Sequence, residues 1–211
     1  MKNVRIFYTK TGRMKFVSHL DMNRLMPRLI KRSGLPVWYT EGFNRHIYIN
    51  YAVPLSLGFE GEYEVMDIRL TDDGYSLTEV TDRLNAVTVD GIKFIRAAEP
   101  LLATKDIAFA EYEIKFEKKL PDGAEKFFEK EEILCRKTAK KGKIKEINIM
   151  PLIKSFSIDA DTLSLILPAG NENNLNPSLV VSAFFENTGC PSVFYAVRRK
   201  MLFDREMNRF V

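Results

Sequence analysis

The sequence predicts an α+β protein built from two tandem ferredoxin-like units, with mainly antiparallel sheets and helices on one face. Segments rich in β-branched and aromatic residues alternate with amphipathic segments of helical period. Each half of the chain follows the order strand–helix–strand–strand–helix–strand, with one extra strand in the first half. A chain of 211 residues is long enough for two such units, expected at residues 1–100 and 106–211. A single larger sheet is the alternative.

The first elements follow from local patterns. Residues 4–8 are β-branched and aromatic, which predicts a strand, and residues 14–17 alternate as a short returning strand. Ser18 is a suitable cap for a helix that should end at Gly34. Pro27 lies inside this helix, so we expect a bend or an interruption there.

The rest of the first half reads as several strands and one helix. Ser76 and Glu79 form a second capping pattern for a helix over residues 76–86. The strands are expected at residues 37–39, 47–49, 52–55, 63–70 and 92–95, with a loop at residues 41–46.

The second half repeats this alternation. Asn176 and Pro177 predict the start of a helix through residue 187, with asparagine as its cap and proline at the first helical position. A shorter helix is expected at residues 122–130. The strands are expected at residues 112–116, 144–149, 155–158, 162–167 and 193–197, and the third and fourth of these form a hairpin.

Composition excludes several classes of protein. The two cysteines, Cys135 and Cys190, are far apart and form no CxxC pair, which excludes a disulfide framework and a cysteine-only zinc or iron–sulfur site. The N-terminus shows no signal-peptide pattern and no apolar stretch is long enough to span a membrane. The phosphate-cradling, nucleophile-elbow and zinc-protease motifs are also missing. We therefore expect a cytoplasmic protein without a metal or cofactor.

Basic residues are concentrated in two places. Residues 1–34 contain nine Lys or Arg and one acid, and a second cluster surrounds Gly142. Arg198, Arg199 and Lys200 add positive charge to the last strand. Clustered cations are typical of a surface that binds a polyanion, and a solvated basic face is the alternative. The candidate nucleic-acid-binding residues are Lys10, Arg13, Lys15, His19, Arg24, Arg28, Arg45, His46, Lys140, Lys141 and Lys143.

The chain has two histidines, and each has a structural alternative to a functional role. His19 lies at the start of the first helix beside Ser18 and Asp21, and it is the candidate for a general acid or base. His46 lies in a loop next to Arg45, where contact with a ligand is favoured. No spacing connects the two histidines as metal ligands.

Two stretches carry a resemblance to a known family. The first joins residues 5–12 (RIFYTKTG) to residues 15–21 (KFVSHLD), and the second joins residues 39–46 (YTEGFNRH) to residues 52–58 (AVPLSLG). Together they resemble the bacterial radical-SAM-linked domain of unknown function. Arg45 departs from the family, which usually has proline there. The resemblance implies a radical SAM partner, while this chain lacks the CxxxCxxC motif of such an enzyme.

These observations lead to three functional hypotheses. The first is an RNA-binding accessory protein that works with a radical SAM enzyme in the modification of RNA such as tRNA or rRNA. The second is a metal-independent endoribonuclease that uses His19 and resembles CRISPR repeat-processing enzymes, although this chain lacks their glycine-rich C-terminal loop. The third is a protein-binding adaptor whose Arg24 and Arg28 pair with acidic residues of the radical SAM partner.

Overall fold

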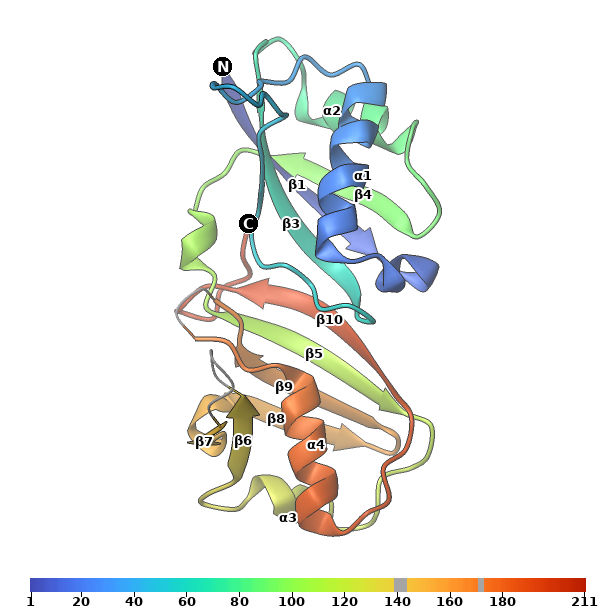
Figure 1. Cartoon of the computed structure of the whole chain (residues 1–211), viewed down its shortest axis with the longest axis vertical. Helices are drawn as coiled ribbons and strands as arrows, with labels where there is room; N and C mark the ends of the chain where they lie inside the picture. The colour runs from blue at the N-terminus through green and yellow to red at the C-terminus, as the bar shows by residue number, and fades with distance from the viewer. Residues whose placement is uncertain (139–143, 171–172) are drawn as a thin grey trace.

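The computed structural model describes residues 1–138, 144–170 and 173–211. In this part of the chain one eight-stranded sheet passes through both halves, in the order β4-β1-β3-β10-β5-β9-β8, with β2 beside β3. The first half lies above the second along the long axis in Figure 1. The protein is therefore a mixed α+β structure with a mostly antiparallel sheet. Its strands pair as one larger sheet, which is the alternative that the sequence left open beside two separate sheets.

The first half has a strictly antiparallel arrangement. Its strands are β1 (Lys2–Lys10), β2 (Ile49–Tyr51), β3 (Glu60–Leu70) and β4 (Ile92–Ala98), and its helices are α1 (His19–Arg32) and α2 (Leu77–Asn85). β1 pairs with both β3 and β4, and β2 pairs with the far side of β3. Helix α1 therefore connects β1 to β2, which have β3 between them, and α2 connects β3 to β4, which have β1 between them.

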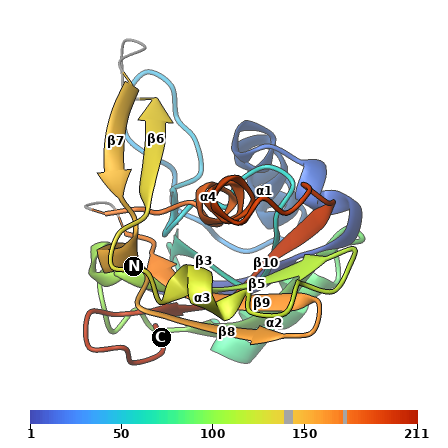
Figure 2. The same cartoon turned by 90° about the horizontal axis from the view of Figure 1, so that it is seen from below.

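The second half repeats this arrangement and adds a ribbon. Its sheet strands are β5 (Phe109–Phe116), β8 (Ser155–Asp159), β9 (Thr162–Pro168) and β10 (Tyr195–Phe203), and its helices are α3 (Glu125–Phe128) and α4 (Pro177–Thr188). The ribbon consists of β6 (Leu134–Thr138) and β7 (Ile144–Asn148), which pair only with each other. Figure 2 shows this ribbon standing away from the sheet, on the side that carries α1 and α4.

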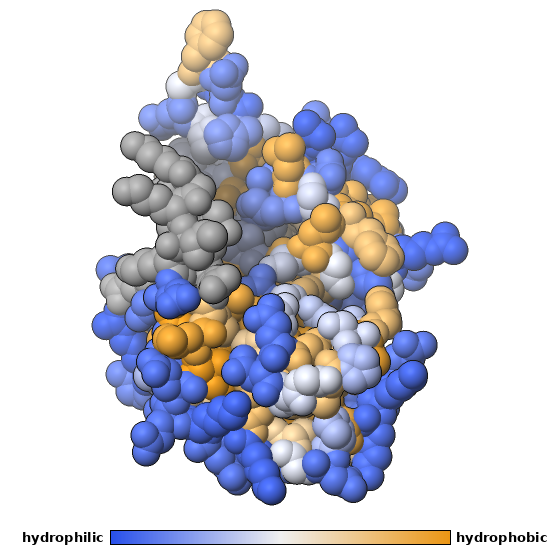
Figure 3. Space-filling model, turned by 60° about the horizontal axis from the view of Figure 1, so that its bottom comes forward, coloured by the Kyte–Doolittle hydropathy of each residue, from blue (hydrophilic) through white to orange (hydrophobic). Residues whose placement is uncertain are grey.

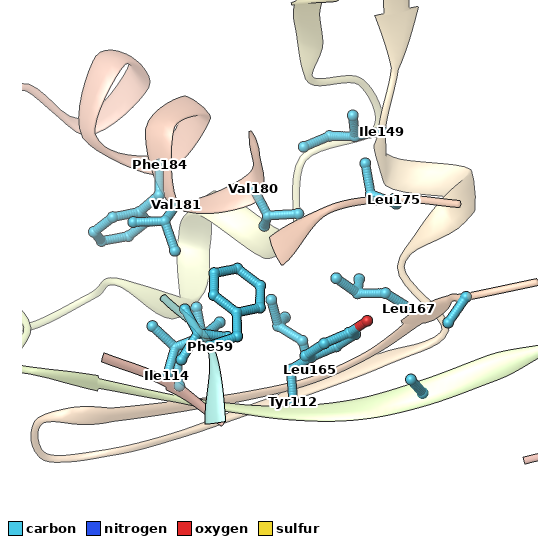
Figure 4. Close-up of a cluster of buried hydrophobic side chains, with 14 of the residues drawn as sticks. Phe59, Tyr112, Ile114, Ile149, Leu165, Leu167, Leu175, Val180, Val181 and Phe184 are labelled. Carbon is cyan, nitrogen blue, oxygen red and sulfur yellow. The ribbon is translucent and has the colours of Figure 1, made fainter. Parts of the chain in front are cut away.

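The helices cover the sheet with apolar side chains. Met26 of α1 and Leu84 of α2 share a buried cluster with Ile6 and Ile68 of the sheet. In the second half, α4 packs on the sheet in the same way (Figure 4). Phe59, which comes directly before β3 in the first half, reaches between α4 and this second sheet region (Figure 4). The core of the second half is therefore completed by a residue of the first.

The local signals for helix starts are confirmed. Ser18 accepts a hydrogen bond from the Asp21 N–H at 3.1 Å, and Ser76 accepts one from the Glu79 N–H at 3.1 Å. Asn176 caps α4 by accepting from the Ser178 N–H at 2.9 Å. These bonds satisfy backbone donors that have no partner inside the helix.

Several predicted elements of the first half are wrong. Residues 14–17 do not form a strand, because a 3₁₀ helix covers Gly12–Phe16 and is closed by hydrogen bonds such as Val17 N–H to Met14 O. α1 is not interrupted at Pro27, whose neighbour Met26 is fully buried in the core. Residues 37–39 do not form a strand, since Val37 and Tyr39 make only isolated bridges. The strand expected at residues 47–49 is shifted along the chain and forms β2, at Ile49–Tyr51.

The second half also differs from its prediction. The strand expected at residues 144–149 is confirmed as β7, but its partner β6 was not expected, and the ribbon adds strands to this half rather than to the first. The helix expected at residues 122–130 is only the short α3, and the last strand extends to Phe203. The boundaries of two units at 1–100 and 106–211 stay a prediction.

Candidate functional site

The two halves join at a narrow contact between strands, which we call the seam. β3 and β10 run parallel there, and their register contains only two residue pairs, Arg198 with Glu60 and Arg199 with Gly61. The side chains and loops around the seam must therefore supply much of the contact between the halves.

The two stretches that carry the family resemblance meet beside the seam. The Gly58 N–H donates to the Lys15 carbonyl at 2.8 Å, which joins the segment 52–58 to the 3₁₀ helix. The Gly12 N–H donates to Glu60 Oε1 at 3.1 Å. These stretches are therefore in direct contact, although Lys15 and Gly58 are 43 positions apart in the sequence.

The segment 52–58 also contacts the second half. The Val53 carbonyl accepts a hydrogen bond from Arg199 Nη2 at 2.6 Å. Asn176, the cap of α4, donates from Nδ2 to Ser56 Oγ at 3.5 Å. The segment thus lies across the seam and is held from both sides.

A buried ion pair connects the halves beneath this segment. The side chain of Arg199 in β10 is 1% exposed and that of Glu64 in β3 is 4% exposed, and Arg199 Nε donates to Glu64 Oε1 at 2.9 Å. The Tyr112 side chain also hydrogen-bonds to Arg199. Burial alone would disfavour the charged guanidinium, but the nearby Glu64 carboxylate raises the pKa of Arg199 above its ordinary value.

Gly61 makes room for this ion pair. A Cβ atom at Gly61 would lie 2.2 Å from Glu64 Oε1, far inside van der Waals contact. The absence of a side chain at the second register pair of the seam therefore lets the Glu64 carboxylate turn toward Arg199.

A small cavity of about 20 Å³ lies on the first-half side of the ion pair. It has room for about one water molecule. Its polar lining comes from Tyr8, Lys10, His19, Tyr51 and Glu64. Burial raises the pKa of Tyr8 and of Tyr51 above the ordinary value for tyrosine, and it lowers the pKa of Lys10.

A larger cavity of about 280 Å³ lies on the second-half side, and Val53, Pro54 and Leu55 line both cavities. Arg199 and Tyr112 contribute polar atoms from the sheet, and Asn174 and Asn176 contribute amides from the start of α4. The seam thus offers hydrogen-bond donors and acceptors in a pocket whose lining is polar and apolar in similar measure, an arrangement suited to binding a small polar group.

The structure places His19 at this site and His46 elsewhere. His19 is exposed at the mouth of the small cavity, with its ring 5.2 Å from the ring of Tyr51 and its Nε2 3.4 Å from Asn23 Nδ2. His46 is also exposed, but its Nδ1 lies 3.1 Å from Thr40 Oγ1 in its own loop, and it lines neither seam cavity. Within the described residues, no three His, Cys, Asp or Glu side chains come together as metal ligands.

The predicted nucleic-acid-binding cations fall into different environments. Lys10 is 3% exposed, and its ammonium donates to the Val17 carbonyl at 2.8 Å, so it points into the protein. Lys15 lies 4.0 Å from Glu60, and Arg24 pairs with Asp21 at 3.2 Å. Arg13, Arg28 and Arg45 are exposed. Lys140, Lys141 and Lys143 lie outside the described residues.

The residues that build the seam are not among the site residues that the sequence predicts. Arg199 was grouped with surface cations of the last strand, whereas it is buried against Glu64. A signal was present in the sequence, because Arg199 alternates with Val197, a position that faces the core. Gly61 and Glu64 gave no local signal, since their roles depend on a strand that lies more than 130 residues away.

The fold and the seam define an α+β protein with a candidate binding site between two halves of one sheet. The chain belongs to a bacterial family described as an uncharacterized protein conserved in bacteria (DUF2344), whose model matches residues 3–177. The match includes both stretches discussed above and Glu64, and it ends before Arg199. Among curated proteins, none matches the chain. None of the described helices has the length and apolar character needed to cross a membrane.

Proposed function

We propose that this protein is an RNA-binding accessory protein that works with a radical SAM enzyme, in the modification of an RNA such as tRNA or rRNA. The observation that carries the proposal is the ribbon formed by β6 and β7. Residues 134–148 contain six Lys or Arg and one acid, and the ribbon stands clear of the sheet (Figure 2). A projecting basic ribbon suits contact with a phosphate backbone, where binding depends on positive charge.

The radical SAM partnership rests on the resemblance of residues 5–21 and 39–58. Those stretches expose five large apolar side chains, Phe16, Leu20, Tyr39, Phe43 and Leu57, of which we take Phe16, Leu20 and Leu57 together. Leu57 lies next to Gly58, and Phe16 lies next to Lys15. The hydrogen bond between Gly58 and Lys15 therefore brings Leu57 and Phe16 close together. Figure 3 shows hydrophobic side chains among hydrophilic ones on one face of the molecule. Exposed apolar residues that gather in one region are typical of a protein-binding surface, so we assign these three to the partner.

RNA binding can be measured by fluorescence anisotropy with labelled tRNA at about 50 mM salt and at increasing salt. We expect the affinity to fall steeply with salt. Changing Lys140, Lys141 and Lys143 to Ala should weaken binding. It should also reduce the slope of log affinity against log salt concentration by about two to three, because each lost phosphate contact removes about one released counterion.

The matched control changes Lys118, Lys119 and Lys126 to Ala. These three lysines are exposed and lie outside residues 134–148, and the triple change removes the same amount of charge. The control should bind RNA much as the wild type does. No binding at about 50 mM salt, or equal losses in the two triple variants, would contradict the proposal.

The partner assignment has its own test. Co-purification of this chain with a radical SAM protein from the same bacterium should be lost in the double variant Phe16→Ser and Leu57→Ser. Leu101→Ser is the control, because Leu101 is exposed in the connection between the halves. Retention of the partner by the double variant would remove these residues from the interface.

The endoribonuclease remains a second candidate because His19 shares a cavity with Lys10 and Tyr51. An imidazole, an ammonium and a phenol are groups that can exchange protons in RNA cleavage. However, the Tyr51 hydroxyl donates to the Met22 carbonyl at 3.2 Å, and Lys10 donates to Val17. Incubating RNA with wild type and with His19→Ala decides the question, since equal or absent cleavage rejects this function.

We also infer that the two halves are ferredoxin-like units. The strand orders β4-β1-β3-β2 and β10-β5-β9-β8 support this inference, since each half has two helix-containing crossovers around a central strand. In this interpretation the ribbon is an insertion into the second unit, between α3 and β8.

A further inference from the structure

A separate cavity of about 450 Å³ lies at the end of the second-half sheet. Phe109, at the start of β5, and Pro168, at the end of β9, face each other as register partners there. The cavity shares no lining residue with the two seam cavities. Its volume lies in the range of about 300–1,000 Å³ that is usual for small-molecule sites.

One side of this cavity is apolar and contains one aromatic ring, that of Phe109. The apolar side chains come from Ile107, Phe109, Pro151, Leu152 and Pro168. Phe109 is only half-buried, so part of its ring remains available to a ligand. Gly170 closes the wall by close backbone approach, because a Cβ atom there would lie 2.5 Å from the Ile107 carbonyl oxygen. The wall therefore suits a planar apolar group.

The charged side chains of the described lining are all basic. They are Lys105, Lys154 and Arg205, and each is exposed. Lys154 Nζ lies 5.9 Å from the centre of the Phe109 ring, so a positive charge stands directly beside the apolar wall. The described lining contains no carboxylate that would repel an anion. A ligand that combines a flat ring with negative charge fits both features.

We propose that this cavity binds one nucleotide, with the base against Phe109 and the phosphate between Lys105 and Lys154. A base stacks favourably on an aromatic ring, and charge-assisted hydrogen bonds to phosphate strengthen the binding further. The nucleotide is either a free nucleoside phosphate or one unit of a single RNA strand. The site does not depend on the ribbon that carries the proposed RNA binding.

Isothermal titration calorimetry with adenosine 5′-monophosphate tests the site directly. We expect binding to the wild type, at least tenfold weaker binding of adenosine, and at least fivefold weaker binding of the nucleotide to Lys154→Gln. Phe109→Leu should weaken binding by a similar factor, because it keeps an apolar side chain and removes the ring. Lys118→Gln, an exposed lysine elsewhere, should bind as the wild type does.

A single-stranded RNA hexamer distinguishes the two sources of the nucleotide. If the hexamer binds at least tenfold more tightly than the monophosphate and loses this advantage in Phe109→Leu, the site takes a unit of a strand. If the monophosphate binds as tightly as the hexamer, the site takes a free nucleotide. The ribbon variant of Lys140, Lys141 and Lys143 should keep its affinity for the monophosphate, which separates this proposal from RNA binding by the ribbon.

Two results would overturn the proposal. One is that the variants Phe109→Leu and Lys154→Gln bind both the monophosphate and the hexamer with the affinity of the wild type. The other is that sodium decanoate binds at these residues while the monophosphate does not, which would make the cavity a site for an aliphatic anion.

Discussion

Two arginines are buried in the sheet, and they join different parts of the molecule. Arg5 of β1 pairs with Asp67 of β3, its direct register partner within the first half, at 2.8 Å. Arg199 of β10 pairs with Glu64 of β3 across the seam. Arg5 thus reinforces strands that already share a long ladder, whereas Arg199 acts where the backbone register has only two pairs.

The two arginines also differ in how their carboxylates are shielded from water. Asp67 is 15% exposed at its side chain, while Glu64 is 4% exposed. Arg5 additionally donates to the carbonyls of Leu102 and Val211, and its guanidinium lies 4.5 Å from the centre of the Phe210 ring. A similar pair of residues therefore does two different things. Arg5 with Asp67 holds Val211 and the connection at Leu102 against the first half, whereas Arg199 with Glu64 joins the two halves of the sheet.

The largest effect is expected for Arg199→Met. This change leaves Glu64 buried without its partner, so the free energy of unfolding should fall by about 3–5 kcal/mol. Urea denaturation measures the loss. The double variant with Glu64→Met should be less destabilised than Arg199→Met alone, because no unpaired charge remains in the core. Strictly additive losses would show that the two side chains do not act as a pair.

A smaller loss is expected for Arg5→Met. Asp67 can reach water after the change, so the free energy of unfolding should fall by about 2–3 kcal/mol. Urea denaturation again measures it, with Arg69→Met as the control, since Arg69 is a half-buried arginine of the same sheet. A loss equal to or larger than that of Arg199→Met would reverse the ranking of the two sites.

Gly61→Ala tests the room made for Glu64. The added methyl group would meet the Glu64 carboxylate at 2.2 Å, so the seam must shift, and overpacking of this kind costs about 1–3 kcal/mol. Thermal unfolding should show a lower Tm. In a Glu64→Ala background, Gly61→Ala should lower the Tm by less, because the clashing carboxylate is gone. An equal loss of Tm in that background would show that the clash is not the cause.

The smallest effect concerns pH at the seam. Burial raises the pKa of Tyr8 above about 10, its value in the unfolded chain, so the protonated tyrosine contributes stability below pH 10. This contribution is lost as the pH rises above about 10, at up to about 1.4 kcal/mol per pH unit. Urea denaturation at pH 9 and pH 10.5 should show a smaller loss for Tyr8→Phe than for the wild type. Parallel losses in both proteins would mean that Tyr8 is not linked to folding in this range.

Local elements could be predicted because their signals lie within a few residues. The caps at Ser18, Ser76 and Asn176 and the hairpin of β8 and β9 follow from hydrogen bonds or alternation inside short segments. Residues 14–17 alternate like a strand, but their backbone closes on itself through a turn at Gly12, so the pattern was misleading. Short apolar runs of this kind do not distinguish a strand from a helical turn.

Of the candidate site, the sequence indicated His19, which the structure places at the seam. The segment 52–58, which also lines the seam, was expected only as a strand at residues 52–55 and as part of the resemblance. It did not indicate that Lys10 points inward, because a basic residue on a strand is usually solvated. It also did not indicate the nucleotide cavity, whose lining comes from four separate segments of the second half.

The sequence by itself determined the α+β class, the helix starts, the basic ribbon residues and the family resemblance. Only the tertiary structure decided that the two halves share one sheet, and that Arg199, Gly61 and Glu64 meet at the seam. The physical reason is that strand pairing between β3 and β10 joins residues 138 positions apart, such as Glu60 and Arg198, and no local pattern specifies such a partner. Burial of the two charges follows from that pairing, since each becomes tolerable in the core only beside the other.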